Sequence, residues 1–257
     1  MAEIDLAAAV EREYLGTWRK LGELAERGDL EPGPPLCVAS GAPIAFFNLA
    51  FFTEPSSDPQ ADLDSVDLFF RAHDLPYGVV FRDGVDPYAE GHVRDAGFAK
   101  VEVLPGMAMH PLGDLPSTPT GLDVEEVDTA DRHEAFLALV AESFGMPLDI
   151  LAETFPFELA QSPGIVELMG SESGRPVTGA MVSVTDGIAG VYNVVTTPAA
   201  RGRGLGAHMT WSAIEAGRAQ GCDIATLQSS KMGLGVYRRM GFQEVSKYNV
   251  YMKDPDG

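Results

Sequence analysis

Basic residues, cysteines and long apolar runs are all scarce in this sequence. Its 257 residues include 18 Lys and Arg against 38 Asp and Glu, a formal net charge of -20. Such acidity argues against a nucleic-acid partner, whose phosphates would be repelled, and weakly favours cationic acceptors such as amines. The alternative is that the acidity only keeps the protein soluble. No run approaches the roughly 20 apolar residues of a membrane span, and the N-terminus is acidic and amphipathic, so we expect a cytoplasmic protein with no membrane partner.

Metal ligands and disulfides are not indicated either. Cys37 and Cys222 are the only cysteines, and they lie far apart without a Cys-x-x-Cys spacing. The five histidines are scattered. We therefore expect two free thiols and no metal site.

The order of apolar runs and turn residues predicts a mixed α/β sheet in two domains. The segment 113–123, GDLPSTPTGLD, is rich in Pro, Ser, Thr and Gly and is interpreted as a linker between domains 1–112 and 124–257. After it, helical spacing follows Thr129, a predicted N-cap, and a short helix is expected in PLDILAETF. Three strand-like runs then give way to strand, helix, strand, helix and strand. Antiparallel hairpins followed by strand-helix-strand units are typical of a mixed sheet.

A weak internal repeat supports a duplicated architecture. VRDAGFAKVE (93–102) and YRRMGFQEVS (237–246) share four of ten residues in register, including the Gly-Phe pair. Both copies fall at a predicted helix-to-strand junction near the end of a domain. The first copy has Val93 where the second has Tyr237, and no glycine-rich basic turn precedes it. We therefore expect the N-terminal copy to have lost its site.

The positive charge that does exist is concentrated near the C-terminus. Residues 201–257 contain eight basic and five acidic residues, whereas the remainder contains ten and thirty-three. Within RGRGLGA (201–207), glycines at 202, 204 and 206 let the backbone approach a ligand, and the two arginines add charge. Amides of the first turn of a helix have no intrahelical partner, and the helix dipole favours anions there. The turn is therefore interpreted as a diphosphate site; the alternative is an ordinary capped turn with solvated arginines.

Other phosphate motifs fit this turn less well. GRGLGA also matches a dinucleotide-binding fingerprint, but four residues separate its strand from the motif, and Asp223 stands at the start of the next strand rather than at its end. A Walker A loop is excluded because no Gly-Lys-Ser/Thr follows the glycines.

Two motifs in order resemble those of the GCN5-related N-acetyltransferases (GNAT). V-x-x-x-P-x-x-R-G-R-G-L-G-A (194–207) resembles the acetyl-CoA signature R/Q-x-x-G-x-G/A of that family. About 30 residues later, SKMGLGVYRRMGF resembles the second signature, a polar residue, a tyrosine seven positions on, and Gly-Phe. Ser230 stands where asparagine is commoner. The resemblance covers roughly residues 124–253 and implies two tandem copies of a GNAT-like acyl-CoA-binding fold, the first degenerate.

The resemblance implies a role for each matching residue. The backbone of the strand before the turn would hold the pantetheine arm, the turn would bind the diphosphate, and Tyr237 would be the general acid for the departing thiolate. Tyr237 could also be a core aromatic of an amphipathic helix. The implied acetyl-CoA-binding residues are Val194, Val195, Thr196, Arg201, Gly202, Arg203, Gly204, Leu205, Gly206, Ala207 and Ser230.

The general base stays open. The strand GVYNVVTT carries Tyr192 and Asn193 where many relatives carry a carboxylate. Asn193 would orient a water or the substrate, and Glu142 or Glu167 would supply a distant carboxylate. The alternative for each of the two glutamates is an ordinary solvated residue. Cys222 is expected to be packed, which leaves no covalent acyl-cysteine route.

The resemblance implies direct acetyl transfer from acetyl-CoA, a co-substrate, to a primary amine of a small molecule or peptide. The alternatives are a longer acyl group, or a noncatalytic module that senses acyl-CoA and binds a partner. The oligomeric state stays open, with a homodimer as one option.

Overall fold

The computed structural model describes residues 4–253 and divides into two compact units. Unit 1 contains the described residues up to Thr17 together with Gly106–Val245, and unit 2 contains Trp18–Pro105 together with the described residues from Ser246 onward. Neither unit is one continuous piece of chain, because each includes a segment from the other half of the sequence.

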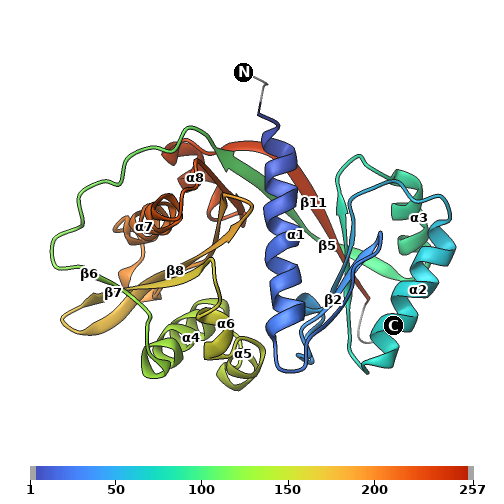
Figure 1. The fold of residues 1–257 in the computed structure, drawn as a ribbon, viewed down its shortest axis with the longest axis horizontal. Helices are drawn as coiled ribbons and strands as arrows, with labels where there is room; N and C mark the ends of the chain where they lie inside the picture. The colour runs from blue at the N-terminus through green and yellow to red at the C-terminus, as the bar shows by residue number, and fades with distance from the viewer. Residues whose placement is uncertain (1–3, 254–257) are drawn as a thin grey trace. The chain divides into compact units, whose positions relative to one another are not determined.

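Unit 1 is a mixed sheet between two layers of helices. Its strand order is β5-β10-β9-β8-β7-β6, in which β9 and β10 run parallel and the other described pairs run antiparallel. In Figure 1, α7 lies on one side of β7 and β8, and α4, α5 and α6 lie on the other. The strands are β5 (Phe98–Met109, of which 106–109 belong to this unit), β6 (Asp123–Glu126), β7 (Ile165–Glu172), β8 (Arg175–Thr185), β9 (Ile188–Thr196) and β10 (Ile224–Gln228).

The helices of unit 1 follow the expected amphipathic patterns. Their bounds are α4 (Ala130–Phe144), α5 (Leu148–Thr154), α6 (Phe157–Ala160), the 3-10 turn η2 (Pro198–Ala200), α7 (Leu205–Ala219) and α8 (Leu234–Met240), with the first part of α1 (Leu6–Leu24). The Thr129 side chain caps α4, as predicted, by accepting a hydrogen bond from the Arg132 amide. One face of β8, β9 and β10 packs under α7 in a core that includes Val182, Ala189 and Met209.

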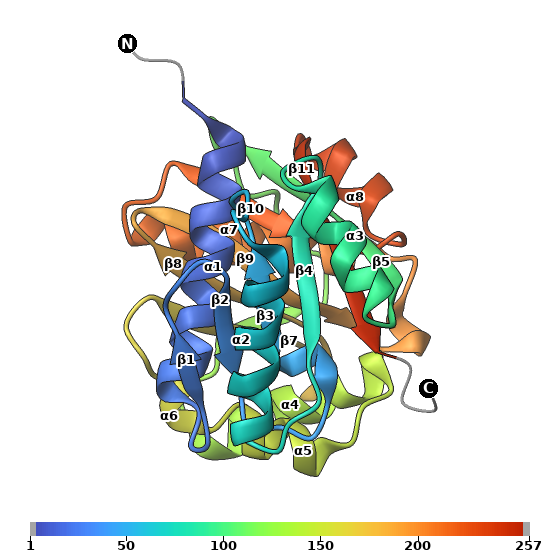
Figure 2. The ribbon, with the colours of Figure 1, turned by 90° about the vertical axis from the view of Figure 1, so that its right-hand side faces the viewer.

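Unit 2 is a smaller mixed sheet with two helices on one face. Its strand order is β1-β2-β3-β4-β11, and β3 and β4 are its parallel pair. Helices α2 and α3 lie in front of these strands in Figure 2. The elements are β1 (Asp29–Glu31), β2 (Leu36–Ala39), η1 (Ala45–Phe47), β3 (Leu49–Phe52), α2 (Pro59–Ala72), β4 (Gly78–Arg82), α3 (Pro87–Asp95) and β11 (Gln243–Lys253).

The two halves of the chain repeat the same order of elements and exchange their last strands. The series β3-α2-β4-α3-β5 corresponds to β9-α7-β10-α8-β11. The end of β5 pairs antiparallel with β10 in unit 1, and the end of β11 pairs antiparallel with β4 in unit 2. The predicted mixed α/β fold is therefore confirmed, with an N-terminal half that carries a shortened version of it.

The segment predicted to be a linker has no regular secondary structure. No helix or strand is assigned between Met109 and Asp123. The division into domains 1–112 and 124–257 describes the duplicated halves of the sequence, whereas the compact units are defined by contacts, so that division remains a proposal. No helix within residues 4–253 is long and apolar enough to cross a membrane.

Candidate active site

Strands β9 and β10 separate into a V-shaped opening in the middle of unit 1. They pair in parallel from Ile188 and Ile224 to Gly190 and Thr226, and no further pairing between them is present in the described chain. Asn193 adopts a left-handed φ of 48°, and the register between β9 and β8 shifts beside it. This β-bulge bends β9 while its other edge stays bound to β8. Residues 194–196, predicted to hold the pantetheine arm, lie in the open arm of the V.

The predicted diphosphate turn leads directly into α7. Gly202 and Gly204 have φ values of 77° and 80°, which only glycine adopts without strain. A Cβ atom at either position would meet nothing within 4 Å, so the space over the turn is open. Within the described chain no side chain caps the start of α7. The first-turn amides and the helix dipole are therefore available to an anion, and the residues present fit a diphosphate.

Both arginines of the turn already have local partners. The Arg201 guanidinium donates from Nε to the Thr196 carbonyl at 3.1 Å. Arg203 pairs with Glu172, with 2.9 Å between Nη1 and Oε2. The hydrogen bond from Arg203 lowers the pKa of the Glu172 carboxyl. The sequence alone indicated two available cations at this turn, whereas the structure leaves the backbone amides as its principal donors.

Hydrophobic anchoring holds the turn in place. Leu205, at the first position of α7, is 2% exposed and packs with Leu122 and Ala200. Ala207 lies half-buried one residue after Gly206. Leu205 therefore faces the core, while Gly202 and Gly204 face open space.

Ser230 lies in the loop before α8, and Tyr237 lies within that helix. Ser230 is exposed, and its Oγ accepts a hydrogen bond from the Gly233 amide at 3.2 Å. The Tyr237 ring packs beside Gly233, where a Cβ would come within 2.7 Å of the ring. Burial raises the pKa of the Tyr237 hydroxyl, and a hydrogen bond with Thr210 of α7 acts in the opposite direction. Tyr237 is therefore a neutral, half-buried phenol on the α7 side of the sheet.

A buried carboxylate that sequence reasoning missed lies at the apex of the V. Glu13 of α1 is fully enclosed. Its carboxylate accepts hydrogen bonds from the Tyr192 hydroxyl at 2.6 Å, from Thr17 Oγ1 at 2.7 Å and from Thr226 Oγ1 at 3.3 Å. Nothing in EREYLG distinguishes this glutamate from the other acidic residues of an amphipathic helix, so the sequence held no signal for it.

Of the carboxylates named as distant bases, one lies on α4 and the other on β7. Glu142 is exposed on α4. Glu167 is buried and accepts a hydrogen bond from His133 Nδ1 at 2.7 Å, while His133 Nε2 lies 2.8 Å from the Phe155 carbonyl. This pair ties α4 to β7 and to the end of α5, and its role is structural.

The His133–Glu167 pair predicts a pH dependence of stability. Burial alone would lower the pKa of His133, but the hydrogen bond and charge of Glu167 raise it above its ordinary value. A raised folded-state pKa stabilises the fold below the unfolded-state pKa of about 6.5, and this contribution is lost as pH rises through the folded value. Hydrogen bonds to charged groups contribute about 1.5–3 kcal/mol. We expect His133→Gln to lower the melting temperature by several degrees at pH 6 and by less at pH 9.

His208 supplies the matched control for that measurement. It is buried on α7, and burial lowers the pKa of its imidazole. A lowered pKa of a base destabilises the fold on the acidic side, so His208→Gln should reduce the loss of stability below pH 6. Equal melting-temperature differences for His133→Gln at both pH values would contradict the assigned ion pair.

Cys37 and Cys222 are both free and buried, and the packing of Cys222 was predicted. Burial raises the pKa of the Cys222 thiol, and the neighbouring carboxylates of Asp223 and Glu13 raise it further. Burial likewise raises the pKa of Cys37 to about 12. Thiols held in the protonated form are poor nucleophiles, which argues against an acyl-cysteine route.

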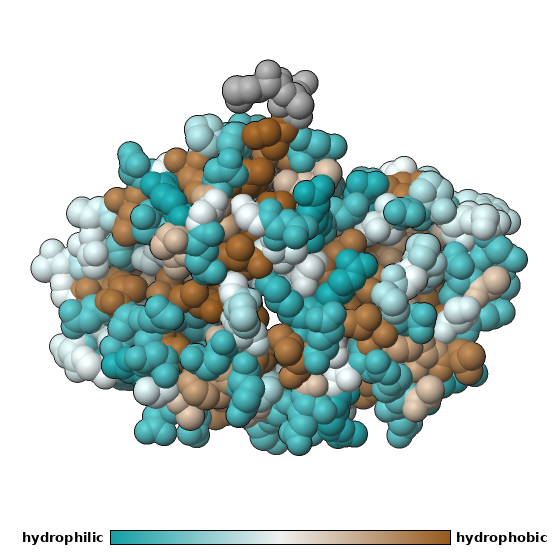
Figure 3. All heavy atoms as spheres, viewed as in Figure 1, coloured by the Kyte–Doolittle hydropathy of each residue, from teal (hydrophilic) through white to brown (hydrophobic). Residues whose placement is uncertain are grey.

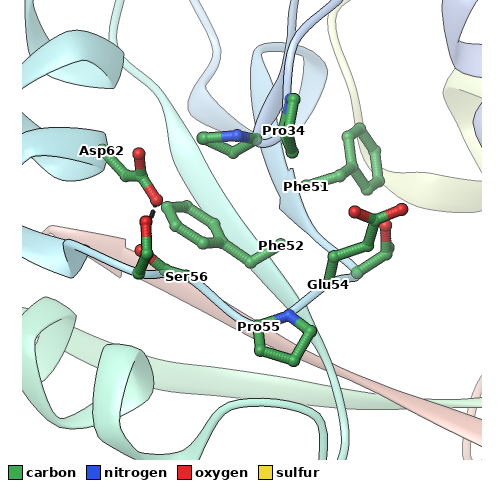
Figure 4. Close-up of a pocket in the computed structure, with 10 residues that line it drawn as sticks. Pro34, Phe51, Phe52, Glu54, Pro55, Ser56 and Asp62 are labelled. Carbon is green, nitrogen blue, oxygen red and sulfur yellow. Dashed lines mark hydrogen bonds between the residues drawn. The ribbon is translucent and has the colours of Figure 1, made fainter.

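The N-terminal half carries carboxylates at the place that corresponds to the diphosphate turn. The Asp58 carboxylate caps α2 by accepting from the Ala61 amide at 3.2 Å, and Asp86 accepts from the Ser56 amide at 2.8 Å. Figure 4 shows Ser56 Oγ directed at Asp62 on one side of a small pocket, with Glu54 on the other. The chain's own carboxylates thus occupy these amides, and their charge would repel a phosphate.

A second cavity, of about 260 Å³, lies within unit 1 at the opposite ends of β9 and β10 from the turn. Its lining includes Ile4, Ile188 and Ile224. Hydrophobic residues gather beside the start of α1 in Figure 3.

Among residues 4–253, no group of three or more His, Cys, Asp or Glu is placed to bind a metal.

Comparison with known proteins identifies what this fold is similar to. Residues 133–242 match the sequence model of the Acetyltransferase (GNAT) family. Comparison with curated proteins found no match. A GCN5-related N-acetyltransferase from Kribbella flavida is similar in structure, with a TM-score of 0.74 and 21% identity over 100% of this chain and 98% of that one.

Two further solved structures share the fold. A putative GNAT-family acetyltransferase from Novosphingobium aromaticivorans has a TM-score of 0.57 and 19% identity over 96% of this chain and 99% of that one. A tandem GNAT protein from the clavulanic acid biosynthesis pathway has a TM-score of 0.55 and 15% identity, covering 75% of this chain and 68% of that one. At these identities the likeness shows the fold, including its tandem form.

Proposed function

We propose that this protein, whose residues 133–242 match the Acetyltransferase (GNAT) family model, transfers an acetyl group from acetyl-CoA to a primary amine of a small molecule or peptide. The observation that carries the proposal is the start of α7, which no described side chain caps, beside the open arm of β9. The N-terminal half has a similar fold but lacks this turn, and by itself it would not support binding of acetyl-CoA.

The proposed binding mode uses backbone groups. The amides around Gly204, Leu205 and Gly206 would hold the diphosphate of acetyl-CoA. Residues 194–196 would bind the pantetheine arm along the edge of β9 that β10 leaves open. Arg201 and Arg203 would attract the anion by their charge more than by direct hydrogen bonds, because each guanidinium already has a partner.

The proposed chemistry is direct attack of a neutral amine on the thioester carbon in a ternary complex. Holding the two reactants in the correct geometry can supply roughly 7–11 kcal/mol of the acceleration. Tyr237 would donate its phenolic proton to the departing thiolate. A tyrosine whose pKa is raised by burial remains protonated at neutral pH, as this role requires.

A free-thiol release assay tests the function. The purified protein is incubated with acetyl-CoA and a panel of polyamines, aminoglycosides, amino acids and peptides. We expect thiol release that depends on at least one amine and a mass increase of one acetyl group on that amine. CoA binding without amine-dependent turnover on any panel member would instead favour a noncatalytic acyl-CoA-binding module.

A further inference from the structure

We propose that Tyr192 and Glu13 form a proton relay that deprotonates the acceptor amine. In this relay Tyr192 contacts the amine, and Glu13 acts through Tyr192 as a positioning residue that receives the proton. The inference rests on the proposed transferase function and assigns the base that the sequence of β9 lacks.

The position of Tyr192 supports its contact with the acceptor. It lies two residues beyond Gly190, the last β9 residue paired with β10, and therefore in the open arm of the V. Because side chains alternate along a strand, Tyr192 shares the face of Gly190, where Glu13 packs, and not the face of Ala189 and Val191, which pack under α7. The residue is half-buried, whereas Glu13 is fully enclosed. The carboxylate is therefore closed to a ligand in the V, whereas Tyr192 leaves part of its side chain exposed.

The fold reserves space for the Glu13 carboxylate. A Cβ at position 190 would overlap its atoms, so only glycine fits beneath it. Burying a carboxylate is costly unless it is hydrogen-bonded, and three hydroxyl groups donate to this one. Thr17, one of these donors, accepts in turn from the Ser183 hydroxyl, with 2.7 Å between the two oxygens. An apolar side chain such as leucine at position 13 would attach α1 to the sheet without the cost of burying a carboxylate. We therefore infer that the carboxylate has a function.

The relay and the proposed acid lie on opposite faces of the sheet. Tyr237 lies on the α7 side, through Thr210, and Tyr192 lies on the α1 side, through Glu13. A thioester in the V between them would therefore meet an amine on one face and have its thiolate protonated from the other. This separation keeps the proton donor and the proton acceptor from neutralising each other.

Gln228 adds an unpaired amide to the same opening. Its side-chain oxygen and nitrogen are both buried and have no hydrogen-bond partner among residues 4–253. It lies two residues after Thr226 on β10 and so shares the face that contacts Glu13. Buried polar groups are nearly always hydrogen-bonded. The Gln228 amide is therefore available to hydrogen-bond the amine substrate in the V.

The proton steps balance as follows. The acceptor ammonium gives one proton to the Tyr192 oxygen as the Tyr192 hydroxyl proton passes to Glu13. The neutral amine nitrogen then bonds to the thioester carbon and the carbon–sulfur bond breaks. The thiolate takes the Tyr237 proton, the second proton of the amine nitrogen passes to solvent, and Tyr237 takes one proton back from solvent. Glu13 returns its proton to solvent through Tyr192, so one proton is released for each acetyl group transferred.

The surroundings of the relay fit this path. Among the described residues, the titratable groups that interact with it include Cys222, before β10, and Tyr14 on α1. Burial, together with the charge of Glu13, raises the pKa of Tyr192 well above its ordinary value. Tyr192 therefore stays protonated between turnovers, and it passes a proton to Glu13 without remaining as a phenolate.

The test compares Glu13→Gln, Glu13→Asp and Tyr192→Phe with Glu134→Gln, at an exposed glutamate of α4 in the same unit. Rates are measured from pH 6.5 to 10 with spermidine, or with the panel amine that the wild-type protein acetylates fastest. We expect Glu13→Gln and Tyr192→Phe to lower kcat/KM for the amine about tenfold at pH 7, with KM for acetyl-CoA unchanged within twofold. The deficit should disappear near pH 10, where the amine is already neutral in solution. Glu13→Asp should retain an intermediate rate, and Glu134→Gln should match the wild type.

Three outcomes would overturn the relay. Wild-type rates in Glu13→Gln, a deficit of the same size at every pH, or a normal rate in Tyr192→Phe would each refute it while leaving the transferase function in place. Absence of thiol release by the wild-type protein with every amine would refute both proposals. If Glu13→Gln fails to fold in a thermal melt, Tyr192→Phe decides the question, because it leaves the buried carboxylate and two of its donors in place.

Discussion

Gly206→Asp is expected to weaken CoA binding at least 100-fold while the protein stays folded. Gly206 is the second residue of α7, and a Cβ there would make ordinary contacts, 3.4 Å from Thr196 Oγ1 and 3.8 Å from Val194 Cγ1. The new carboxylate would lie among the amides proposed to bind the diphosphate, where it competes for them and repels the ligand. The loss corresponds to about 2.7 kcal/mol of binding free energy.

The same substitution should not lower stability. An acidic residue in the first turn of a helix interacts favourably with the dipole by about 0.3–1 kcal/mol, and replacing a helical glycine removes a further cost of about 0.5–1 kcal/mol. We therefore expect an unchanged or slightly raised melting temperature together with lost binding. A general folding defect would lower both the melting temperature and the affinity for CoA, so it would not produce this combination.

Gly206→Ala is the matched control. Alanine fills the same contacts without the charge, so it should keep CoA affinity within about threefold in titration calorimetry. Wild-type affinity in both the aspartate and the alanine variants would place the diphosphate elsewhere and remove the main support for the proposed function. Equal loss in both would indicate that the backbone approach itself, rather than charge, is what the glycine provides.

The turn and its helix were predictable because their signals are local. Three glycines and two arginines within seven residues, followed by apolar residues at helical spacing, specify a helix start that an anion can approach. The strands β7, β8 and β9 and the helix α4 were predicted for the same reason, since each is bounded by its own turn residues or cap.

The features that sequence reasoning missed depend on partners far away in the chain. Glu13 accepts hydrogen bonds from Tyr192, 179 residues later, and from Thr226, 213 residues later. The Arg203–Glu172 pair joins the turn to the end of β7. The exchange of β5 and β11 between the units is also invisible in a single sequence, because both strands follow a Gly-Phe junction with the same local pattern. Pairing at such distances is decided by packing, which no local pattern encodes.

The degenerate N-terminal copy illustrates a limit of motif reasoning. The missing Arg-Gly turn predicted a lost site, but a missing motif does not say what replaced it. The structure shows Asp58 and Asp86 bound to amides of the corresponding turn. Helix starts are commonly capped by aspartate, which stabilises the helix. In this half of the chain the helix start is stabilised by its own carboxylate, whereas in the other half it is left for a ligand.

Tyr237→Phe is expected to lower turnover at least tenfold and to leave CoA affinity within twofold. The substitution removes one hydroxyl from a ring that still packs beside Gly233 and on Phe242, whose ring centroid lies 5.9 Å from that of Tyr237. Positioned acid–base groups typically contribute 10²–10⁴-fold, and loss of the proton donor acts on the departing thiolate alone. Tyr88→Phe, at an exposed tyrosine of unit 2, is the control and should behave as the wild type.

The pH profile separates the acid role of Tyr237 from a packing role. Because burial raises the pKa of this phenol, the donor stays protonated through pH 9, and wild-type kcat should show no decline on the alkaline side below about pH 10. A wild-type kcat that falls between pH 7 and 9 would mean that a group of lower pKa supplies the proton. Turnover by Tyr237→Phe equal to that of the wild type would remove the acid role altogether, and the thiolate would then have to leave without protonation from α8.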